Sequence, residues 1–263
     1  MRKKDISNYR GESPGKKEAR LIVHETNKDE LGKRAFIRGP HLVIASQQAG
    51  DVSVLLEMGV KPQSIYAIDI DRHELAAAKS RYAGSGVNFH HCDFKNAHRE
   101  LGVERFETAL IDLCAPIRIA TLREVLKLNA TITGLEFMCC RELGSVARYV
   151  RQKKQKHPAR SRLDYLKMQG FHPFVCLYYV SRTETTNGNP MGIVLRTGRR
   201  RPKSPTIVDV NATYREQRRK ITYSTGPSMG NLYNIPKETV ACWRSWEIRW
   251  EKTTRRWYGP GSR

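Results

Sequence analysis

The run His41-Leu-Val-Ile-Ala-Ser46 opens the stretch that decides the fold, residues 41–112. Three more apolar runs follow at 64–69, 87–90 and 107–112, in alternation with helical patterns, and acidic residues stand at or just beyond their ends. Strands that alternate with helices of this length predict a parallel sheet. In such sheets ligands bind outside the carboxyl ends of the strands, so residues placed there are candidate site residues whatever the ligand.

Two helical patterns complete the first strand–helix–strand unit. Residues 51–58 carry an apolar stripe typical of a helix packed on a sheet, and Gly59 ends it. Residues 71–82 predict a second helix, in which Asp71 is the expected N-cap and Glu74 stands at the capping-box spacing.

The alternation continues beyond residue 112. The sequence predicts an amphipathic helix at 117–128, a strand at 131–139 and a basic helix at 142–155. Two β-rich runs, 171–182 and 191–197, are joined by a turn-forming segment and predict an antiparallel hairpin. The expected fold class is therefore α/β, with a mostly parallel seven-stranded sheet that ends in an antiparallel hairpin.

Composition divides the chain into four parts. Residues 1–40 are expected to form a basic arm, unpatterned up to residue 20, followed by a lead-in helix. The sheet domain is expected at 41–197, a linker rich in Arg and Pro at 198–205, and a small basic α-helical module at 206–263.

The charge balance indicates a polyanionic partner. The 263 residues include 47 Lys and Arg against 26 Asp and Glu, a formal net charge of +21, and residues 198–263 alone hold 15 basic and 5 acidic side chains. An excess of this size attracts nucleic acid, DNA or RNA. The oligomeric state does not follow from the sequence.

The cysteines and the hydropathy narrow the class of protein further. The six cysteines form no C-x-x-C pair and have no His partner at metal-ligand spacing, so we expect no zinc site, and most lie in predicted strands as small buried residues do. No apolar run has the length of a membrane span. We expect a soluble, cytoplasmic protein without a membrane partner.

The loop after the first strand carries a resemblance. It reads Ile44-Ala-Ser-Gln-Gln-Ala-Gly50, where class I, Rossmann-like S-adenosylmethionine-dependent methyltransferases have the pattern acid-x-G-x-G-x-G, and only the last glycine is kept. Residues 41–197 resemble that family in the order of elements and in the terminal hairpin. The resemblance implies that S-adenosylmethionine is the cofactor and that its methionine and ribose parts lie against Ser46, Gln47, Gln48, Ala49 and Gly50.

The acidic residues at the strand ends extend the resemblance. Asp69, 19 residues after Gly50, stands where a nucleotide-binding unit offers a carboxylate to ribose hydroxyls, and Ile70 follows it. Asp93 resembles the family position that accepts a hydrogen bond from the adenine amino group, with Phe94 free to stack. A helix cap or loop anchor is the alternative role for each acid. No G-x-G-x-x-G pattern is present, which disfavours a dinucleotide cofactor.

The run Asp112-Leu-Cys-Ala-Pro116 stands where the family places its catalytic loop. Asp112 could hold the acceptor or remove its proton, while Pro116 shapes the loop. The run resembles the Asp-x-Ala-Pro loop of ribose 2′-O-methyltransferases with one residue added, but residues 137–140 lack the lysine which that subfamily has on its fifth strand. Cys114 lacks the Pro-Cys context of enzymes that methylate pyrimidine carbon 5, so a packing role is favoured.

The C-terminal region resembles a DNA-binding motif. Residues 228–243 match the apolar and small positions of a helix-turn-helix. The resemblance implies nucleic-acid contacts by Lys237, Thr239, Arg244 and Arg249. A basic helical hairpin that packs on the sheet domain is the alternative.

The leading hypothesis is an S-adenosylmethionine-dependent methyltransferase acting on DNA or RNA. One alternative is a non-catalytic nucleic-acid-binding protein with a degenerate methyltransferase fold, favoured by the altered glycine loop. A second is a DNA-binding regulator that works through its helix-turn-helix.

Overall fold

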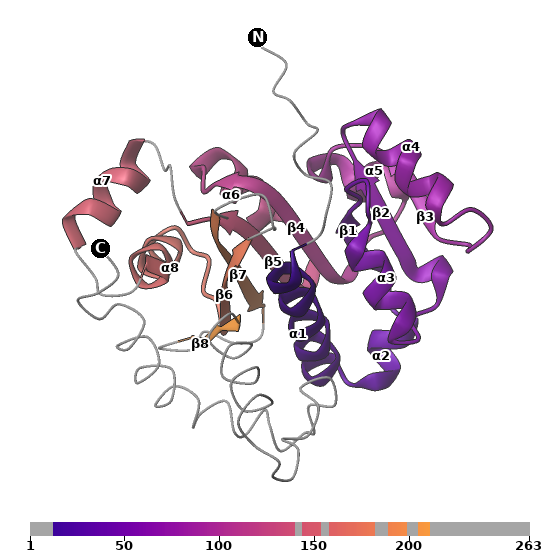
Figure 1. Ribbon diagram of the computed structural model, residues 1–263, viewed down its shortest axis with the longest axis horizontal. Helices are drawn as coiled ribbons and strands as arrows, with labels where there is room; N and C mark the ends of the chain where they lie inside the picture. Colours follow the sequence, from indigo (N-terminus) through magenta and orange to yellow (C-terminus); the bar gives the residue numbers. More distant parts are fainter. Residues whose placement is uncertain (1–12, 140–143, 154–157, 182–188, 199–204, 211–263) are drawn as a thin grey trace.

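An eight-stranded sheet organises the part of the chain that the computed structural model describes, residues 13–139, 144–153, 158–181, 189–198 and 205–210 (Figure 1). Its strand order is β3-β2-β1-β4-β5-β7-β6-β8. The strands are β1 His41–Ile44, β2 Ile65–Asp69, β3 Asn88–His91, β4 Phe106–Pro116, β5 Ala130–Met138, β6 Val175–Ser181, β7 Asn189–Thr197 and β8 Thr206–Asp209. All neighbouring pairs are parallel except the two that involve β7. The mostly parallel sheet and its antiparallel hairpin are thus confirmed.

The expected count of seven strands is wrong by one. The short run Thr206–Asp209 pairs in parallel with β6 and extends the sheet at that edge. It comprises the first four residues of the module predicted at 206–263. Four residues next to a polar, Pro-containing stretch carry too little periodicity to be recognised as a strand from sequence.

Helices cover both faces of the sheet. The helices are α1 Pro14–Leu31, α2 Lys33–Arg38, α3 Gly50–Glu57, α4 Arg72–Arg81, α5 Ala97–Leu101, α6 Ile119–Lys127, α7 Gly144–Lys153 and α8 Pro158–Met168. One apolar core contains buried residues of α1, α3 and α4, and a second, on the other face, contains those of α5, α6 and α8. Adjacent strand residues such as Leu42 and Val43 belong to opposite cores, as the two-residue repeat of a strand requires. Two short 3₁₀ turns, η2 Pro62–Ser64 and η3 Phe94–Asn96, precede β2 and α5.

The N-terminal segment differs from its prediction. Residues 14–20, expected in an unpatterned arm, form the first turns of α1, which begins after Ser13, whose hydroxyl accepts a hydrogen bond from Lys16 N at 3.2 Å. The predicted lead-in helix is divided at Gly32, whose φ of 80° ends α1 before α2 starts. The start of α1 escaped detection because part of its buried face is polar, and periodicity analysis follows apolar residues.

The polar stretch after α7 also contains a helix that the sequence did not predict. Pro158–Met168 forms α8, whose Leu163 and Leu166 enter the core. Over the described ranges, no helix combines the length and the apolar character that crossing a bilayer requires.

Candidate active site

The strand order changes direction next to β1, which makes the carboxyl edge of β1 and β4 the place to look for a site. Chain order runs outward from β1 through β2 to β3 on one side, whereas β4 lies on the other side. In open parallel sheets a crevice forms at this switch point, and ligands bind there. The loop at 45–49 and the end of β4 both lie at this switch point.

The loop after β1 makes a glycine-like turn without glycine. Ala49 has φ 45° and ψ 47°, the left-handed conformation, and it alone among the described non-glycine residues has a positive φ. Such a residue is strained by about 1–2 kcal/mol, and strain of this kind clusters at functional sites. α3 then begins at Gly50. The backbone therefore makes a tight turn into the helix although Gly50 is the one glycine in this loop.

Glu74 holds this loop from α4. The expected N-cap of α4 is confirmed, because the Asp71 carboxylate accepts hydrogen bonds from His73 N at 2.8 Å and Glu74 N at 3.3 Å. In a capping box, the Glu74 side chain would accept a hydrogen bond from Asp71 N. Glu74 Oε2 instead accepts from Gln47 N at 2.6 Å, since the loop after β1 lies within reach of the first turn of α4.

Asp69 ends β2 beside this loop. Its Oδ1 accepts a hydrogen bond from Asp71 N at 2.8 Å, so the carboxylate anchors the turn into α4. Burial raises the pKa of Asp69, and the neighbouring charges of Asp71 and Glu74 raise it further. Ile70 is 71 % exposed, an unusual state for a large aliphatic side chain at a strand end. The pair offers a carboxylate and a free apolar surface at the same point of the edge.

Asp93 follows β3 and serves as the N-cap of η3. Its Oδ1 accepts from Lys95 N at 3.1 Å and its Oδ2 lies 3.3 Å from Lys95 Nζ. Phe94 is partly buried and packs against the core. The capping role that was the alternative for this acid is therefore present in the structure, next to a partly accessible ring.

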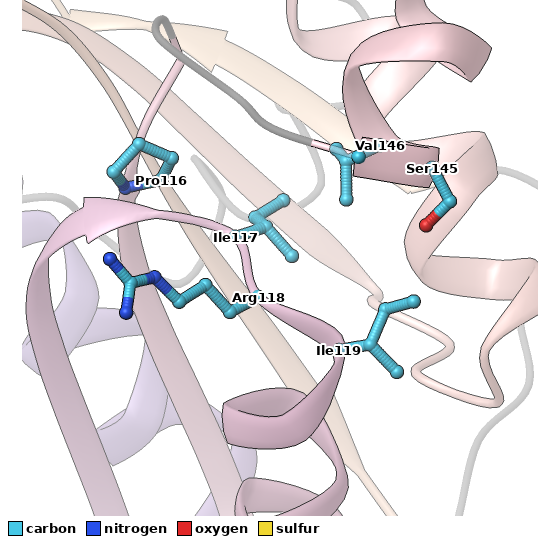
Figure 2. Close-up of a pocket in the computed structure, with 7 residues that line it drawn as sticks. Pro116, Ile117, Arg118, Ile119, Ser145 and Val146 are labelled. Carbon is cyan, nitrogen blue, oxygen red and sulfur yellow. The ribbon is translucent and has the colours of Figure 1, made fainter.

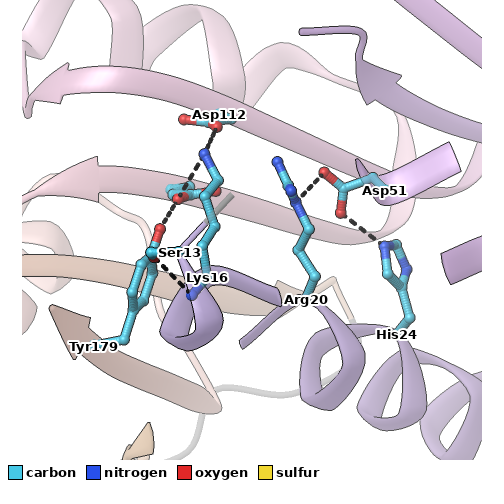
Figure 3. A network of polar contacts seen from close by, with 8 residues as sticks. Ser13, Lys16, Arg20, His24, Asp51, Asp112 and Tyr179 are labelled. Carbon is cyan, nitrogen blue, oxygen red and sulfur yellow. Dashed lines mark hydrogen bonds and ion pairs between the residues drawn. The ribbon is translucent and has the colours of Figure 1, made fainter. Parts of the chain in front are cut away.

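Asp112 lies in a polar cluster that sequence analysis did not find (Figure 3). Lys16 Nζ is 2.6 Å from Asp112 Oδ2 and 3.5 Å from Glu136 Oε1, and the Tyr179 hydroxyl donates a hydrogen bond to the same Glu136 oxygen. The four side chains come from α1, β4, β5 and β6. One ammonium group thus bridges two carboxylates near the end of β4.

Burial makes this cluster sensitive to protonation. The Glu136 side chain is fully buried, which together with the Asp112 charge raises its pKa to about 7, although Lys16 and Arg20 act in the opposite direction. Burial and Glu136 also raise the pKa of Tyr179 well above its usual value. Glu136 Oε2 is buried and makes no hydrogen bond with the described residues. The cluster can therefore hold or release a proton near neutral pH.

A second ionic group fixes α1 in place. Arg20 Nε lies 3.0 Å from Asp51 Oδ2, and His24 Nε2 lies 2.9 Å from Asp51 Oδ1, with all three side chains buried. Burial alone would raise the pKa of Asp51, but Arg20 and His24 hold it well below its usual range. Figure 3 shows Lys16 and Arg20 projecting from the same helix toward carboxylates. Their four-residue spacing places them on one face, so the bond to Asp51 also positions Lys16.

The β4–β5 register is interrupted at this point. Asp112 pairs with Glu136, and the next recorded partners are Pro116 and Met138, so β4 advances four residues while β5 advances two. β4 therefore continues through Pro116 instead of ending at Asp112 as the sequence predicted. Irregularities of this kind occur preferentially next to active sites, because they redirect side chains at the end of a strand.

Four predicted site residues belong to the C-terminal region. Lys237, Thr239, Arg244 and Arg249, with the whole helix-turn-helix segment, lie outside the described residues, and so does the side chain of Cys114. The thiols of Cys92, Cys139 and Cys176 are buried, which confirms their predicted packing role. Within the described ranges, no three His, Cys, Asp or Glu side chains converge in a way that could hold a metal ion.

Comparison with known proteins gives similarity of fold alone. No family model and no curated protein matches the chain. Similar solved structures include an O-methyltransferase from Bacillus cereus in complex with SAH, with 13 % identity, 72 % of this chain and 83 % of that chain covered, and TM-score 0.44. An rRNA methylase from Streptococcus thermophilus has 15 % identity, coverages of 67 % and 94 %, and TM-score 0.40.

A ribosomal protein L11 methylase from Lactobacillus delbrueckii subsp. bulgaricus is also similar, with 11 % identity, coverages of 68 % and 77 %, and TM-score 0.35. Because the identities and TM-scores are this low, we assign functional residues only from the geometry of this chain.

Proposed function

We propose that the chain is an S-adenosylmethionine-dependent methyltransferase that modifies nucleic acid. One observation carries the proposal: the carboxyl edge around β1 presents Asp69 with exposed Ile70 on one side and the Lys16-bridged Asp112 on the other. The first side suits a nucleoside, and the second suits an acceptor that must lose a proton.

The described residues fit the cofactor. The Asp69 carboxylate supplies two acceptor oxygens for a pair of ribose hydroxyls, and Ile70 supplies an exposed aliphatic surface for the flat face of a base. Asp93 would accept from an exocyclic amino group, with Phe94 beside it. The tight turn at Ala49 lets backbone groups of residues 46–50 approach a ligand closely.

The acceptor side is the Lys16, Asp112, Glu136 and Tyr179 cluster. When bound, the cofactor supplies a methyl group on a positively charged sulfur, which keeps the electrons of the broken carbon–sulfur bond while an acceptor lone pair forms the new bond. Asp112 orients the acceptor group and takes up the proton it loses. Lys16 offsets the negative charge that Asp112 and Glu136 bring together, and Glu136 shares its proton with the cluster.

The charge of the protein supports nucleic acid as the substrate class. The formal net charge is +21, and exposed Arg118, Arg148 and Arg151 lie on elements that follow β4 and β5 at the same edge of the sheet. Phosphate neutralisation by such side chains supplies most of the sequence-independent affinity for nucleic acid.

Titration calorimetry of the full chain with S-adenosylmethionine tests the cofactor assignment. Asp69→Asn removes the carboxylate and should weaken binding roughly 10- to 100-fold, the value of hydrogen bonds to a charged group. Glu104→Gln, an exposed change in the loop before β4, is the matched control and should leave binding unchanged. Absence of binding heat and of a thermal shift at millimolar cofactor would refute the proposal.

Transfer of a labelled methyl group to mixed DNA and RNA, followed by nucleoside analysis, tests the acceptor side. Asp112→Asn should lower the transfer rate roughly 10²- to 10⁴-fold, the usual contribution of a general base, with cofactor binding retained. An unchanged transfer rate would remove Asp112 from the mechanism.

A non-catalytic nucleic-acid-binding protein is the second candidate function. The observation that favours it is the hydrogen bond from Gln47 N to Glu74, which occupies a backbone donor of the loop after β1. Retention of nucleic-acid binding in a chain that binds no S-adenosylmethionine would favour this candidate.

A further inference from the structure

A small cavity lies between the turn that follows β4 and the start of α7 (Figure 2). Its volume is about 280 Å³, and it is lined by Pro116, Ile117, Arg118, Ile119, Gly144, Ser145 and Val146. In Figure 2 the side chains of Ile117, Ile119 and Val146 surround the same space. None of the proposed cofactor-binding residues lines it, so the cavity is distinct from the proposed cofactor site.

The cavity lies beyond the carboxyl end of β4, the strand that carries Asp112. Pro116 is the last residue of β4, and the β4–β5 register shifts between Asp112 and Pro116. The residues that line the cavity therefore begin four positions after Asp112, whose carboxylate is proposed to meet the acceptor.

The walls of the cavity suit a flat group with apolar faces. Ile117 and Val146 are each 2 % exposed, and Pro116 and Ile119 are half-buried, so four aliphatic residues form most of the lining. Burying the face of an aromatic ring against these side chains removes apolar surface from water, which favours binding.

The polar part of the lining is basic or neutral. Arg118 is exposed, and its guanidinium can form paired hydrogen bonds with a phosphate. Ser145 Oγ lies 3.0 Å from the Tyr165 hydroxyl, which fixes its direction. Among the described residues that line the cavity, none is acidic. α7 adds the exposed Arg148 and Arg151, so charge complementarity points to an anionic ligand with a flat apolar part.

We propose that this cavity takes the acceptor nucleotide, with the base against Ile117, Ile119 and Val146 and its phosphate on Arg118. The inference rests on the proposed function and extends it. A volume of about 280 Å³ lies just below the usual range of small-molecule pockets, about 300–1,000 Å³, so the cavity has room for one base and not for a base pair. The acceptor nucleotide must therefore be unpaired or turned out of its helix.

Fluorescence anisotropy with the full chain tests the pocket without relying on catalysis. The probes are a short fluorescein-labelled oligonucleotide of mixed sequence, as single-stranded DNA and RNA, and the same sequence as a duplex. Arg118→Gln should weaken single-strand binding about five- to tenfold and reduce the slope of log K against log salt by about 0.7, the value for one phosphate contact on a single strand. Arg123→Gln, an exposed change on α6 that does not line the cavity, should leave affinity and slope unchanged.

Filling the cavity gives a second, charge-independent test. Val146→Phe should weaken single-strand binding at least as much as Arg118→Gln and leave duplex binding unchanged. If Val146→Phe fails to fold, Ile119→Phe places the same bulk at a half-buried position. Unchanged single-strand binding in Arg118→Gln and in the filled variant would overturn the inference.

Cofactor calorimetry separates this inference from the proposed function. If the wild-type chain binds S-adenosylmethionine and the variants lose only oligonucleotide affinity, both stand. If no variant changes oligonucleotide binding while the wild type still binds the cofactor, the inference fails alone. If the variants lose oligonucleotide affinity but the wild type binds no cofactor, the cavity is a nucleotide pocket and the methyltransferase assignment fails.

Discussion

Replacing the buried Glu136 by glutamine should make the protein more stable at pH 8 than the wild type, and the gain should disappear toward pH 4.5. In the folded chain, burial and the Asp112 charge raise the pKa of Glu136 from 4.5 to about 7. The folded state therefore binds a proton that the unfolded state has already released. The stability contributed by the protonated carboxyl is present below about pH 4.5 and is lost as the pH rises through about 7.

The size of the effect follows from the same two values. A separation of two to three pKa units corresponds to about 3 kcal/mol of unfolding free energy. Glutamine has nearly the same shape as glutamate and can still accept a hydrogen bond from the Tyr179 hydroxyl. Because glutamine does not titrate, this pH-dependent contribution to stability vanishes in Glu136→Gln. The variant also loses the attraction between the Glu136 carboxylate and Lys16. The cost in stability is partly offset because Lys16 keeps its 2.6 Å contact with Asp112.

Urea unfolding followed by circular dichroism, at several pH values between about 4.5 and 8, measures the difference between variant and wild type. In the difference between the two unfolding free energies, the contributions of groups that titrate in both proteins cancel. Glu104→Gln, at an exposed position, is the control and should show no pH-dependent difference. A stability difference between Glu136→Gln and the wild type that is the same at both ends of the range would refute the reasoning.

Two further changes test the buried polar groups. Burial lowers the pKa of His41 to about 4, so the stability that the neutral ring contributes is present above about pH 6.5 and is lost as the pH falls through about 4. His41→Gln should therefore reduce the acid-induced loss of unfolding free energy, measured by urea unfolding, by about 3 kcal/mol. An unaltered acid transition in this variant would contradict the prediction. Arg20→Met should cost about 3–5 kcal/mol, because it leaves the Asp51 carboxylate buried beside His24 alone. Adding Asp51→Asn should restore much of that loss in a double-mutant cycle, and simple additivity of the two losses would show that the pair does not act as a unit.

Most of the sheet was predictable because its signals are local. The apolar runs at β1, β2 and β5 are buried strands, and β4 differs from its prediction mainly by continuing to Pro116. The N-cap at Asp71 was predictable for the same reason, since its hydrogen bonds reach only His73 and Glu74. The hydrogen-bond partner of the Glu74 side chain was not predictable, because Gln47 lies in the loop after β1, far from Glu74 in sequence.

The start of α1 shows where periodicity analysis stops. Residues 14–20 look like a charged arm in the sequence because Lys16 and Arg20 are polar, yet both side chains point into the molecule and meet carboxylates. A buried polar face has no apolar period. The four-residue spacing of Lys16, Arg20 and His24, and a glutamate within the apolar run of β5, are the signals that could have revealed the cluster.

The sequence by itself determined the alternation of strands and helices, the terminal hairpin and the acidic residue that ends β2, because each depends on side chains a few positions apart. Only the tertiary structure decided that Lys16 bridges Asp112 and Glu136 and that Tyr179 completes the group. Those residues come from four separate elements, so their contacts exist only in the folded chain, where Arg20 also joins α1 to Asp51. Burial then sets the protonation of Glu136, a property that no stretch of sequence carries alone.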